Sequence, residues 1–294
     1  MKKNFWLLLD KPSGISSAGA LNKLKRILDV NKIGHNGTLD PLASGVLLVA
    51  IGEALKTISF IGPQDKEYAF SIKFGQMTDS YDGEGAIIAE TANLPSQCDI
   101  ESVLPEFLGI ISQTTPIYSA IKIRGKPAYK YARAGEDVIM KSRLINISSL
   151  KLLNYDEISN ESHFLASCSH GTYIRSLAVD IAARVGSLGY VSYLRRTRCG
   201  KYLEKDAISL EQLEKREYNH DAYCREVDDM LGDIPVHQID DQSAQYITYG
   251  QRIDLNVNHT GKLRLYNQNK LHSIVHVETG IIDDIRIFHL HQAQ

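Results

Sequence analysis

The sequence predicts an α+β fold that is built mainly on antiparallel sheet and followed by a small β-rich module. Large apolar side chains occupy every second position of "KEYAFSIKF" (66–74), as expected for a half-buried strand. Strand and helix patterns mix irregularly, unlike the regular β-α-β order of a doubly wound fold. After an acidic stretch (221–241), the chain breaks into short runs separated by Gly, Asn and His. We therefore expect a main domain over 1–231 and a small module over 232–294.

The N-terminal part begins with a short apolar run, "FWLLL", that indicates a buried strand. Ser16 or Ser17 is expected to cap a helix that continues to about Leu28, because leucines three and four residues apart fall on one of its faces. A glycine-rich loop then leads into the run "VLLVAI", which indicates a second buried strand. The elements expected here are strand 5–9, helix 17–28, strand 46–51, helix 53–60, strand 66–74 and helix 99–109.

The second part of the main domain opens with a basic segment rich in tyrosine, 117–138. This segment predicts a strand, a glycine-containing turn and a short helix. The elements expected after it are strands near 143–153 and 163–169, a helix at about 173–185 and a basic strand in "VSYLRRTRCGKYL" (191–203). The small module is expected to form short strands within "QYITYGQRIDL", "KLRLYN" and "HSIVHVETGIIDDIRIF".

The composition is that of an ordinary globular protein. Of its 294 residues, 43% are hydrophobic and 23% are charged. The longest apolar runs are far too short to span a bilayer, and Asp10 and Lys11 end the N-terminal run before a signal peptide could form. The four cysteines are widely scattered, and the ten histidines lack metal-ligand spacing. These observations predict a cytoplasmic protein with reduced cysteines, no membrane segment and no metal.

Charge is segregated along the chain, although the formal net charge is only −2. Residues 122–143 include seven basic and two acidic residues, and residues 195–205 include five basic and one acidic. Residues 221–241 include seven acidic residues and one basic residue. Local basic patches steer a polyanion such as RNA even when the whole protein is near neutral. Ordinary solvated surface charge explains the same counts equally well.

The stretch from Lys32 to Lys56 places three glycines around His35 and Asp40. Glycine is used where the backbone bends sharply or where a partner must come close. Pro41 disfavours the helical region for the residue before it, so Asp40 is presented on a stiff corner just ahead of a buried strand. An Asx turn at a strand entrance is the plain alternative for an isolated Asp-Pro pair.

Other segments carry residues suited to chemistry. Tyr68 lies on the apolar face of its strand, where a hydrogen-bonded core tyrosine is the plain alternative. Tyr173 and Arg175 stand near a helix start, where backbone N–H groups favour anions. Leu194 precedes the basic group 195–198, which a basic surface would also explain. Residue types and spacing alone leave an enzyme and an RNA-binding protein both open.

The chain resembles the bacterial TruB-type tRNA pseudouridine synthases in five motifs. They occur in that family's order and at its approximate spacings, within residues 5–205. The motifs are "LLLDKPSGISS" (7–17), "GHNGTLDPLASGVLLVAIGEALK" (34–56), "PIYSAIKIRGKPAYKYARAG" (116–135), "CSHGTYIRSLA" (168–178) and "YLRRTRCGKY" (193–202). The resemblance implies the pseudouridine synthase core, a long mixed and mainly antiparallel sheet flanked by helices. The small module resembles the family's PUA-like RNA-binding domain weakly.

The resemblance also implies the reaction, in which a uridine inside RNA is isomerised to pseudouridine without cofactor or metal. The expected substrate is uridine 55 in the T loop of tRNA. Asp40 would be the nucleophile, attacking either the sugar or the uracil ring, with Arg175 as its counter-charge. Tyr68 would stack on the base once it is flipped out of the RNA.

The same resemblance assigns residues to substrate binding. His35 would fill the gap that the flipped base leaves in the stack, while Tyr173 and Leu194 would line the pocket. The basic segment 117–143 would form a thumb-like insertion that grips the T stem-loop. The cations expected to contact RNA are Lys11, Lys122, Lys126 and Arg133. The family's bacterial type implies a monomer without an obligate protein partner.

Two other function classes are open at this stage. An RNA-binding or tRNA-folding protein with an idle catalytic site would keep the basic segments, but should have lost at least one of Asp40, Tyr68 and Arg175. An Asp-dependent hydrolase acting on a nucleoside or glycoside would need a second carboxylate at a defined distance. The motifs offer no obvious partner to Asp40 for that role.

Overall fold

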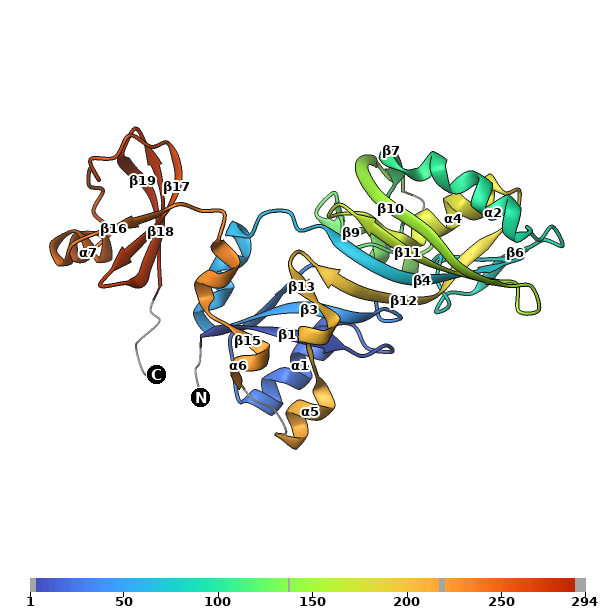
Figure 1. Ribbon diagram of the computed structural model, residues 1–294, viewed down its shortest axis with the longest axis horizontal. Helices are drawn as coiled ribbons and strands as arrows, with labels where there is room; N and C mark the ends of the chain where they lie inside the picture. The colour runs from blue at the N-terminus through green and yellow to red at the C-terminus, as the bar shows by residue number, and fades with distance from the viewer. Residues whose placement is uncertain (1–3, 137, 217–219, 289–294) are drawn as a thin grey trace.

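The computed structural model describes residues 4–136, 138–216 and 220–288. Asp137 of the basic segment and residues 289–294 of the small module lie outside the described residues. Within that part of the chain, eleven strands form one mixed sheet in the path β14-β1-β3-β12-β4-β11-β10-β7, with β2, β13 and β15 paired at its side (Figure 1). The strands are β1 (Phe5–Lys11), β2 (Ile33–Asn36), β3 (Ser44–Ile51), β4 (Lys66–Phe74), β7 (Gly109–Thr114), β10 (Ser142–Asp156), β11 (Glu161–Cys168), β12 (Gly189–Cys199), β13 (Tyr202–Leu203), β14 (Ile208–Ser209) and β15 (Cys224–Arg225). The predicted α+β class with a long mixed sheet is confirmed.

Helices and short hairpins surround this sheet (Figure 1). The helices of the main domain are α1 (Ser17–Leu28), α2 (Gln97–Val103), α3 (Ala128–Arg133), α4 (Ile174–Arg184), α5 (Leu210–Lys215) and α6 (His220–Tyr223). The 3-10 helices are η1 (Gly52–Phe60), η2 (Leu104–Phe107), η3 (Glu204–Asp206) and η4 (Val227–Leu231), and two hairpins pair β5 (Gln76–Thr78) with β6 (Ile87–Glu90) and β8 (Lys122–Ile123) with β9 (Lys126–Pro127).

The two faces of the sheet carry different cores, because side chains alternate along each strand. On β1, Leu7 and Leu9 face a core that includes the apolar side of α1 and of α4. Trp6 and Leu8 face the opposite side, where they pack with η4 and with the C-terminal module. The first face also holds Tyr68, so it is the face on which the predicted site is to be found.

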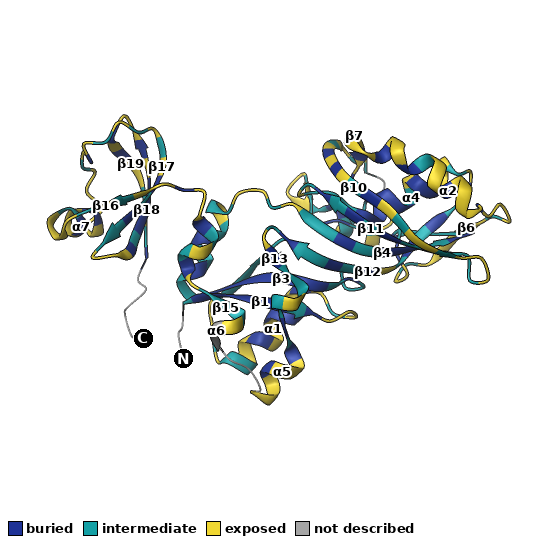
Figure 2. Cartoon of the chain, in the orientation of Figure 1, coloured by how far each residue is buried: buried dark blue, intermediate teal, exposed yellow. Residues whose placement is uncertain are grey.

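The small module is a four-stranded sheet with one helix. Its elements are β16 (Val236–Gln238), α7 (Asp241–Thr248), β17 (Gly261–Asn267), β18 (Lys270–Glu278) and β19 (Ile281–Ile287), in the sheet order β16-β17-β18-β19. It has a core of its own around Ile247 and Leu265. Ile274 and Phe288 join the core behind β1, and Nζ of Lys56 on η1 donates to the carbonyl of Ile287 at 2.9 Å. Figure 2 shows the buried strands of this module beside exposed loops.

Several predicted elements are confirmed. On β4 the side chains at 68, 70, 72 and 74 are all buried, as the alternation required. Ser16 is the cap of α1, since its hydroxyl accepts a 3.0 Å hydrogen bond from the amide of Gly19. The predicted helix at 173–185 is α4, and the predicted basic strand is β12. The helix expected at 53–60 is present, and it is the 3-10 helix η1.

Other predictions of secondary structure were wrong. The helix expected to reach residue 109 ends at Phe107, because Gly109, at φ +82°, turns the chain into β7. Residues 245–248 of the run "QYITYGQRIDL" are helical rather than extended, because Asp240 caps α7 by accepting from the amide of Ser243 at 2.7 Å.

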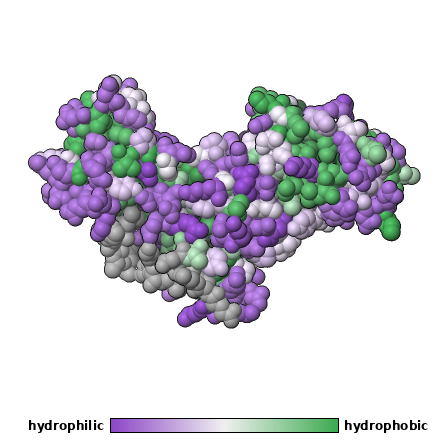
Figure 3. All heavy atoms as spheres, in the orientation of Figure 1, coloured by the Kyte–Doolittle hydropathy of each residue, from purple (hydrophilic) through white to green (hydrophobic). Residues whose placement is uncertain are grey.

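Apolar surface gathers at the end of the main sheet that carries β7 and β10, while hydrophilic residues cover much of the remaining face in that view (Figure 3). Ile110 on β7 and Leu144 on β10 are 74% and 75% exposed.

Candidate active site

The loop that carries Asp40 is fastened to the start of α1. The hydroxyl of Ser17 donates to the carbonyl of Leu39 and accepts from its amide, both at 2.9 Å. The amide of Gly14 donates to the carbonyl of Pro41 at 2.8 Å, and the carbonyl of Asp40 closes a turn onto Ala43. The backbone on both sides of Asp40 is therefore fixed, and its carboxylate is free of the local Asx turn that was the plain alternative.

Arg175 holds the carboxylate of Asp40 from the first turn of α4. Its Nε donates to Oδ2 of Asp40 at 2.9 Å, while its two terminal nitrogens donate to the carbonyls of Ser80 and Tyr118 at 2.9 and 2.8 Å. Arg175 is only 3% exposed. Since the guanidinium is a rigid planar fork, three anchored nitrogens leave it a single orientation.

A second carboxylate, Asp82, shares the same guanidinium. Its Oδ2 lies 3.6 Å from Nε of Arg175, and its Oδ1 accepts from the hydroxyl of Ser80 and the amide of Glu84. The Asp82 side chain is 5% exposed, whereas that of Asp40 keeps 34% of its surface. Asp40 is thus the carboxylate that a substrate can reach, and Asp82 is a buried anchor. The sequence motifs had offered no partner carboxylate for Asp40.

The groups around Asp40 shift the pKa of its carboxyl group in opposite directions. Burial raises the pKa of the Asp40 carboxyl group, and the positive charge of Arg175 opposes that rise. Asp82 adds to the rise because two nearby negative charges repel, while Lys11 lowers the pKa of Asp40. The result is a partly buried carboxylate that is fixed in direction and open on one side, an arrangement that suits a nucleophile.

Tyr68 and Leu194 lie on neighbouring strands of the same sheet. In the β4–β12 ladder Leu194 stands opposite Phe70, and Arg196 stands opposite Tyr68. Burial raises the pKa of the Tyr68 hydroxyl to about 12, against the charge of Arg196. Tyr68 therefore keeps its proton at neutral pH and offers a neutral aromatic ring.

Arg196 is fully buried and links β12 to the glycine-rich loop. Its side chain donates to the carbonyls of Val46 and Gly37 at 2.7 and 3.0 Å. Its backbone lies against Gly45, where an added Cβ would come within 2.2 Å of the Arg196 carbonyl oxygen. Gly45, at φ +100°, is therefore required by the close approach of the two strands.

His35 belongs to β2, a strand inside the segment expected to be a loop. It pairs with Val49 of β3. Its Nδ1 is buried and has no hydrogen-bond partner among the described residues. Burial lowers the pKa of the His35 ring, and the charge of Arg196 lowers it further. A ring held neutral in this way suits insertion among stacked bases.

Tyr173 directly precedes α4 and is fixed through its backbone. Gln113 of β7 accepts from its amide at 2.8 Å and donates to its carbonyl at 3.0 Å. The guanidinium of Arg143 lies 5.1 Å from the centre of the Tyr173 ring. This is a cation–π interaction, which stabilises the positions of both side chains.

Lys11, which the family resemblance assigned to RNA contact, is buried. Its Nζ donates to the carbonyls of Pro12 and Ile15 at 2.9 and 2.7 Å, and lies 3.5 Å from that of Pro41. Burial lowers the pKa of Lys11 to about 8, against the charge of Asp40. This geometry favours a role in holding the Asp40 loop.

The basic segment forms a small unit on the rim of the site. The β8–β9 hairpin turns at Arg124 and Gly125, which both have positive φ, and leads directly into α3. Lys122, Lys126 and Arg133 are exposed in this unit. None of them is among the hydrogen-bond partners of Asp40 or Arg175. Tyr118 connects this unit to the site, since its carbonyl accepts from Arg175 and its hydroxyl donates to Asp79 at 2.9 Å.

The second basic segment, 195–205, exposes less charge than its composition suggests. Arg195 is paired with Asp10 at 2.9 Å and with Glu204 at 2.6 Å, on the face opposite to Tyr68. Arg196 is fully buried.

The structure adds Asp82, Gln113 and Arg196 to the residues that sequence reasoning had identified. Only Arg196 had a usable signal, because it lies two residues after Leu194 and so shares its face.

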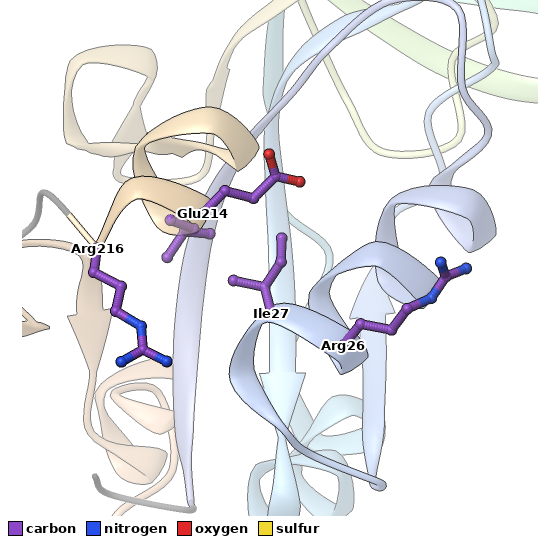
Figure 4. A pocket seen from close by; sticks show the side chains of 5 residues that line it. Arg26, Ile27, Glu214 and Arg216 are labelled. Atoms are coloured by element: carbon purple, nitrogen blue, oxygen red, sulfur yellow. The ribbon is translucent and has the colours of Figure 1, made fainter.

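A separate hollow lies between the end of α1 and α5. It is lined by Ile27 and Leu213 together with Arg26, Glu214 and Arg216, whose charged groups point in different directions (Figure 4). None of the predicted site residues lines it. Among the described residues, no helix is long and apolar enough to cross a membrane, and no cluster of three or more His, Cys, Asp or Glu is suited to a metal ion.

Relatives of known family match nearly all of the chain. It is 38% identical over 302 aligned positions to tRNA pseudouridine synthase B of Ehrlichia chaffeensis, covering 97% of this chain and 99% of that protein. It is 42% identical to tRNA pseudouridine synthase B of Rickettsia bellii, with 85% of each chain covered.

Solved structures share the fold. A chain in the crystal structure of a Cbf5-Nop10-Gar1 complex superposes with a TM-score of 0.69 at 22% identity, covering 97% of this chain and 85% of that one. A chain in the structure of an H/ACA RNP bound to a substrate RNA containing 2'-deoxyuridine gives a TM-score of 0.67 at 22% identity, covering 94% and 78%.

Family models match adjacent parts of the sequence. The model of the N-terminal domain of the TruB family pseudouridylate synthases matches residues 25–174, which include Asp40, Tyr68 and Tyr173. The model of the tRNA pseudouridylate synthase B C-terminal domain matches residues 175–234, beginning at Arg175. On this evidence, the chain belongs to the TruB family of pseudouridylate synthases.

Proposed function

We propose that this chain isomerises uridine 55 in the T loop of tRNA to pseudouridine, with Asp40 as the nucleophile. The chain is a pseudouridine synthase by family, and its relatives are named as tRNA pseudouridine synthases. The contact between Nε of Arg175 and Oδ2 of Asp40 is the observation that carries the proposal. It gives the reachable carboxylate both a fixed direction and a counter-charge.

The reaction is an internal rearrangement, so atoms and electrons balance without a co-reactant. The bond between N1 of uracil and C1′ of the ribose breaks, the base rotates, and C5 bonds to C1′. The proton displaced from C5 is lost and N1 carries a proton in the product. Asp40 bonds transiently either to C1′ of the ribose, displacing N1, or to the uracil ring. That bond breaks again before the product leaves, which regenerates the carboxylate, and Arg175 stabilises the charge of Asp40 before and after.

The flipped base is proposed to lie between the sheet and the loop. Tyr68 stacks on the uracil from β4, and Leu194 and Tyr173 complete the apolar wall. His35 occupies the place that the base leaves in the RNA stack. Extruding a base costs a few kcal/mol, about the magnitude that such stacking and packing contacts return.

The rest of the RNA is held by exposed parts of the chain. We assign phosphate contacts to Lys122, Lys126 and Arg133 on the thumb-like unit of residues 117–143, because these side chains are solvated and carry no ion pair among the described residues. We further propose that the module of residues 232–294 extends the RNA surface beside a catalytic domain of residues 1–231. The enzyme is proposed to act in the cytoplasm, as a monomer and without an obligate protein partner.

Conversion of an unmodified T-arm stem–loop tests this function. The purified protein should form pseudouridine at position 55 without added cofactor, and should form none when that uridine is replaced by cytidine. Pseudouridine is mapped by chemical labelling of the product RNA. Binding of the stem–loop without any conversion would instead favour an RNA-binding or tRNA-folding protein with an idle site.

A further inference from the structure

Two cations near Tyr68 lack a negatively charged partner. Arg196 is fully buried, and its hydrogen bonds go to two backbone carbonyls. Its Nη1 is buried without any hydrogen-bond partner in the described part of the chain. Lys66 is half-buried, and its Nζ donates to the carbonyl of Gln64 at 3.0 Å. No carboxylate in the described ranges pairs with either residue.

The two cations meet at one turn of the glycine-rich loop. A methyl group placed on Gly37 would lie 3.4 Å from Nη1 of Arg196 and 3.6 Å from Cε of Lys66. Gly37 has φ +80°, so the turn favours glycine and brings the loop backbone close to both cations. His35, with its buried unpartnered Nδ1, is two residues away.

Lys66 also shares a face of the sheet with Tyr68. The two residues are two positions apart on β4, so their side chains point to the same side, about 7 Å apart along the strand. Arg196 stands opposite Tyr68 in the neighbouring strand. The unpaired cations are therefore beside the proposed base pocket, at a separation comparable to the size of one nucleotide.

Burying positive charge without a counter-ion is unfavourable. Burial lowers the pKa of Lys66, and the positive charge of Arg196 acts in the same direction, while the neighbouring Asp65 makes only the smallest of the contributions that oppose this shift. Proteins seldom retain buried charges unless these are paired or bind a ligand. An anion at this place would relieve both the desolvation and the mutual repulsion.

We propose that Lys66 and Arg196, at the Gly37 turn, form a binding site for one phosphate of the RNA backbone next to the flipped uridine. Lys66 supplies the direct contact because it is the more exposed of the two, and Arg196 supplies a fixed positive charge behind it. The site positions the nucleotide; it does not take part in bond making. This inference rests on the proposed function, because the phosphate belongs to the RNA that the enzyme modifies.

The test compares two lysines of the same strand. Lys66→Met removes the ammonium group but keeps most of the aliphatic stem. Lys73→Met is the matched control, because Lys73 lies on β4 at a position facing the opposite side and donates to the carbonyl of Ser159. We expect the Kd for the T-arm stem–loop to rise about tenfold in Lys66→Met, and the slope of log K against log salt to fall by about one. Lys73→Met should match the wild type in both.

A neutral linkage identifies the phosphate itself. Methylphosphonate groups are placed one at a time through the T loop. At one position the substitution should weaken binding to the wild type about tenfold and leave binding to Lys66→Met unchanged, since the same contact cannot be lost twice. Equal losses in both proteins at every position would overturn the inference, as would an unchanged Kd and salt slope for Lys66→Met.

Inorganic phosphate gives a readout that does not involve RNA. It should raise the Tm of the wild type more than that of Lys66→Met, because a ligand stabilises the folded protein that binds it. Equal shifts in both proteins would count against the site. If the wild type forms no pseudouridine at position 55, the proposed function fails, whereas the binding comparison still decides the phosphate site.

Discussion

Arg175 and Asp40 are 135 positions apart in the chain, yet Nε of the arginine donates a 2.9 Å hydrogen bond to Oδ2 of the aspartate. The sheet brings them together, because α4 follows β11 while the Asp40 loop precedes β3. The guanidinium is held by two backbone carbonyls as well as by Asp40, and it also faces the buried Asp82. Arg175 thus fixes the orientation of the exposed carboxylate of Asp40 and balances the charge of the buried carboxylate of Asp82.

Replacing Arg175 by methionine should cost both activity and stability. The buried Asp82 would lose its only nearby guanidinium among the described residues, which typically costs about 3 kcal/mol. We expect the pseudouridine-forming rate to fall at least about 100-fold, because Asp40 also loses its orientation. Urea unfolding and single-turnover kinetics measure the two effects. Arg184→Met, which removes a pair with Glu106 from a 58% exposed arginine, should change stability by less than about 1 kcal/mol.

The rate of pseudouridine formation should fall at acidic pH as the Asp40 carboxyl group becomes protonated. Burial raises its pKa above the ordinary 3.8, and the nucleophile proposed here must be ionised to attack, so the rate should fall as the pH drops through that raised pKa. Asp82→Asn removes one of the charges that raise the pKa of Asp40, leaving Arg175 and Lys11 to lower it. In Asp82→Asn, the fall in rate at acidic pH should therefore begin at a lower pH than in the wild type.

The control for this shift is Asp79→Asn. Asp79 lies in the same loop as Asp82 and accepts from the Tyr118 hydroxyl, but it is not one of the charged groups that shift the pKa of Asp40. Single-turnover rates measured across the acid range should give the wild-type pH dependence for this variant. A fall in the Asp82→Asn rate that coincides with the wild type, or that moves to higher pH, would contradict the electrostatic account.

Gly45→Ala should damage the fold far more than Gly125→Ala. Both glycines have positive φ, at +100° and +83°, so alanine strains the backbone at either position by about 1 kcal/mol. Only at Gly45 would the new Cβ meet another chain segment, 2.2 Å from the Arg196 carbonyl oxygen, whereas Gly125 has open space. Thermal unfolding should show a much lower Tm for Gly45→Ala. Similar Tm values for the two variants would show that β3 and β12 separate at little cost.

Neutralising the thumb-like unit should weaken RNA binding without slowing chemistry. In a variant with Lys122, Lys126 and Arg133 replaced by methionine, we expect the salt slope of RNA binding to fall by about two to three. The single-turnover rate at saturating RNA should stay near that of the wild type, because these side chains lie outside the network of Asp40 and Arg175. A lost rate with unchanged affinity would assign them to catalysis instead.

The sequence predicted strands and capped helices well where local chemistry decides them. The alternation in β4 and the Ser16 cap of α1 are local, and both are present. The strands β2 and β7 could not be found this way, because their pairing with β3 and β10 depends on segments elsewhere in the chain. Helix α7 was missed because the Asp240 cap lies outside the run that had been interpreted as strand.

The site was predictable in part. Residue context singled out Asp40 and Arg175 as candidates and the family resemblance gave them roles, but no local pattern reveals that they form a pair. Asp82 gave no signal, since a buried carboxylate in a turn looks like any turn aspartate. The composition of 195–205 indicated a strongly basic surface. A count of cations cannot show that Arg195 is paired with carboxylates and that Arg196 is buried.

The role of Asp40 is tested most directly by Asp40→Asn, which keeps the size of the side chain and removes its charge. RNA labelled with tritium at C5 of uridine releases tritium when the base is isomerised, and binding is measured on the same stem–loop. We predict that Asp40→Asn binds the RNA within about threefold of the wild type, while tritium release falls below about one thousandth. Release at the wild-type rate would contradict the account.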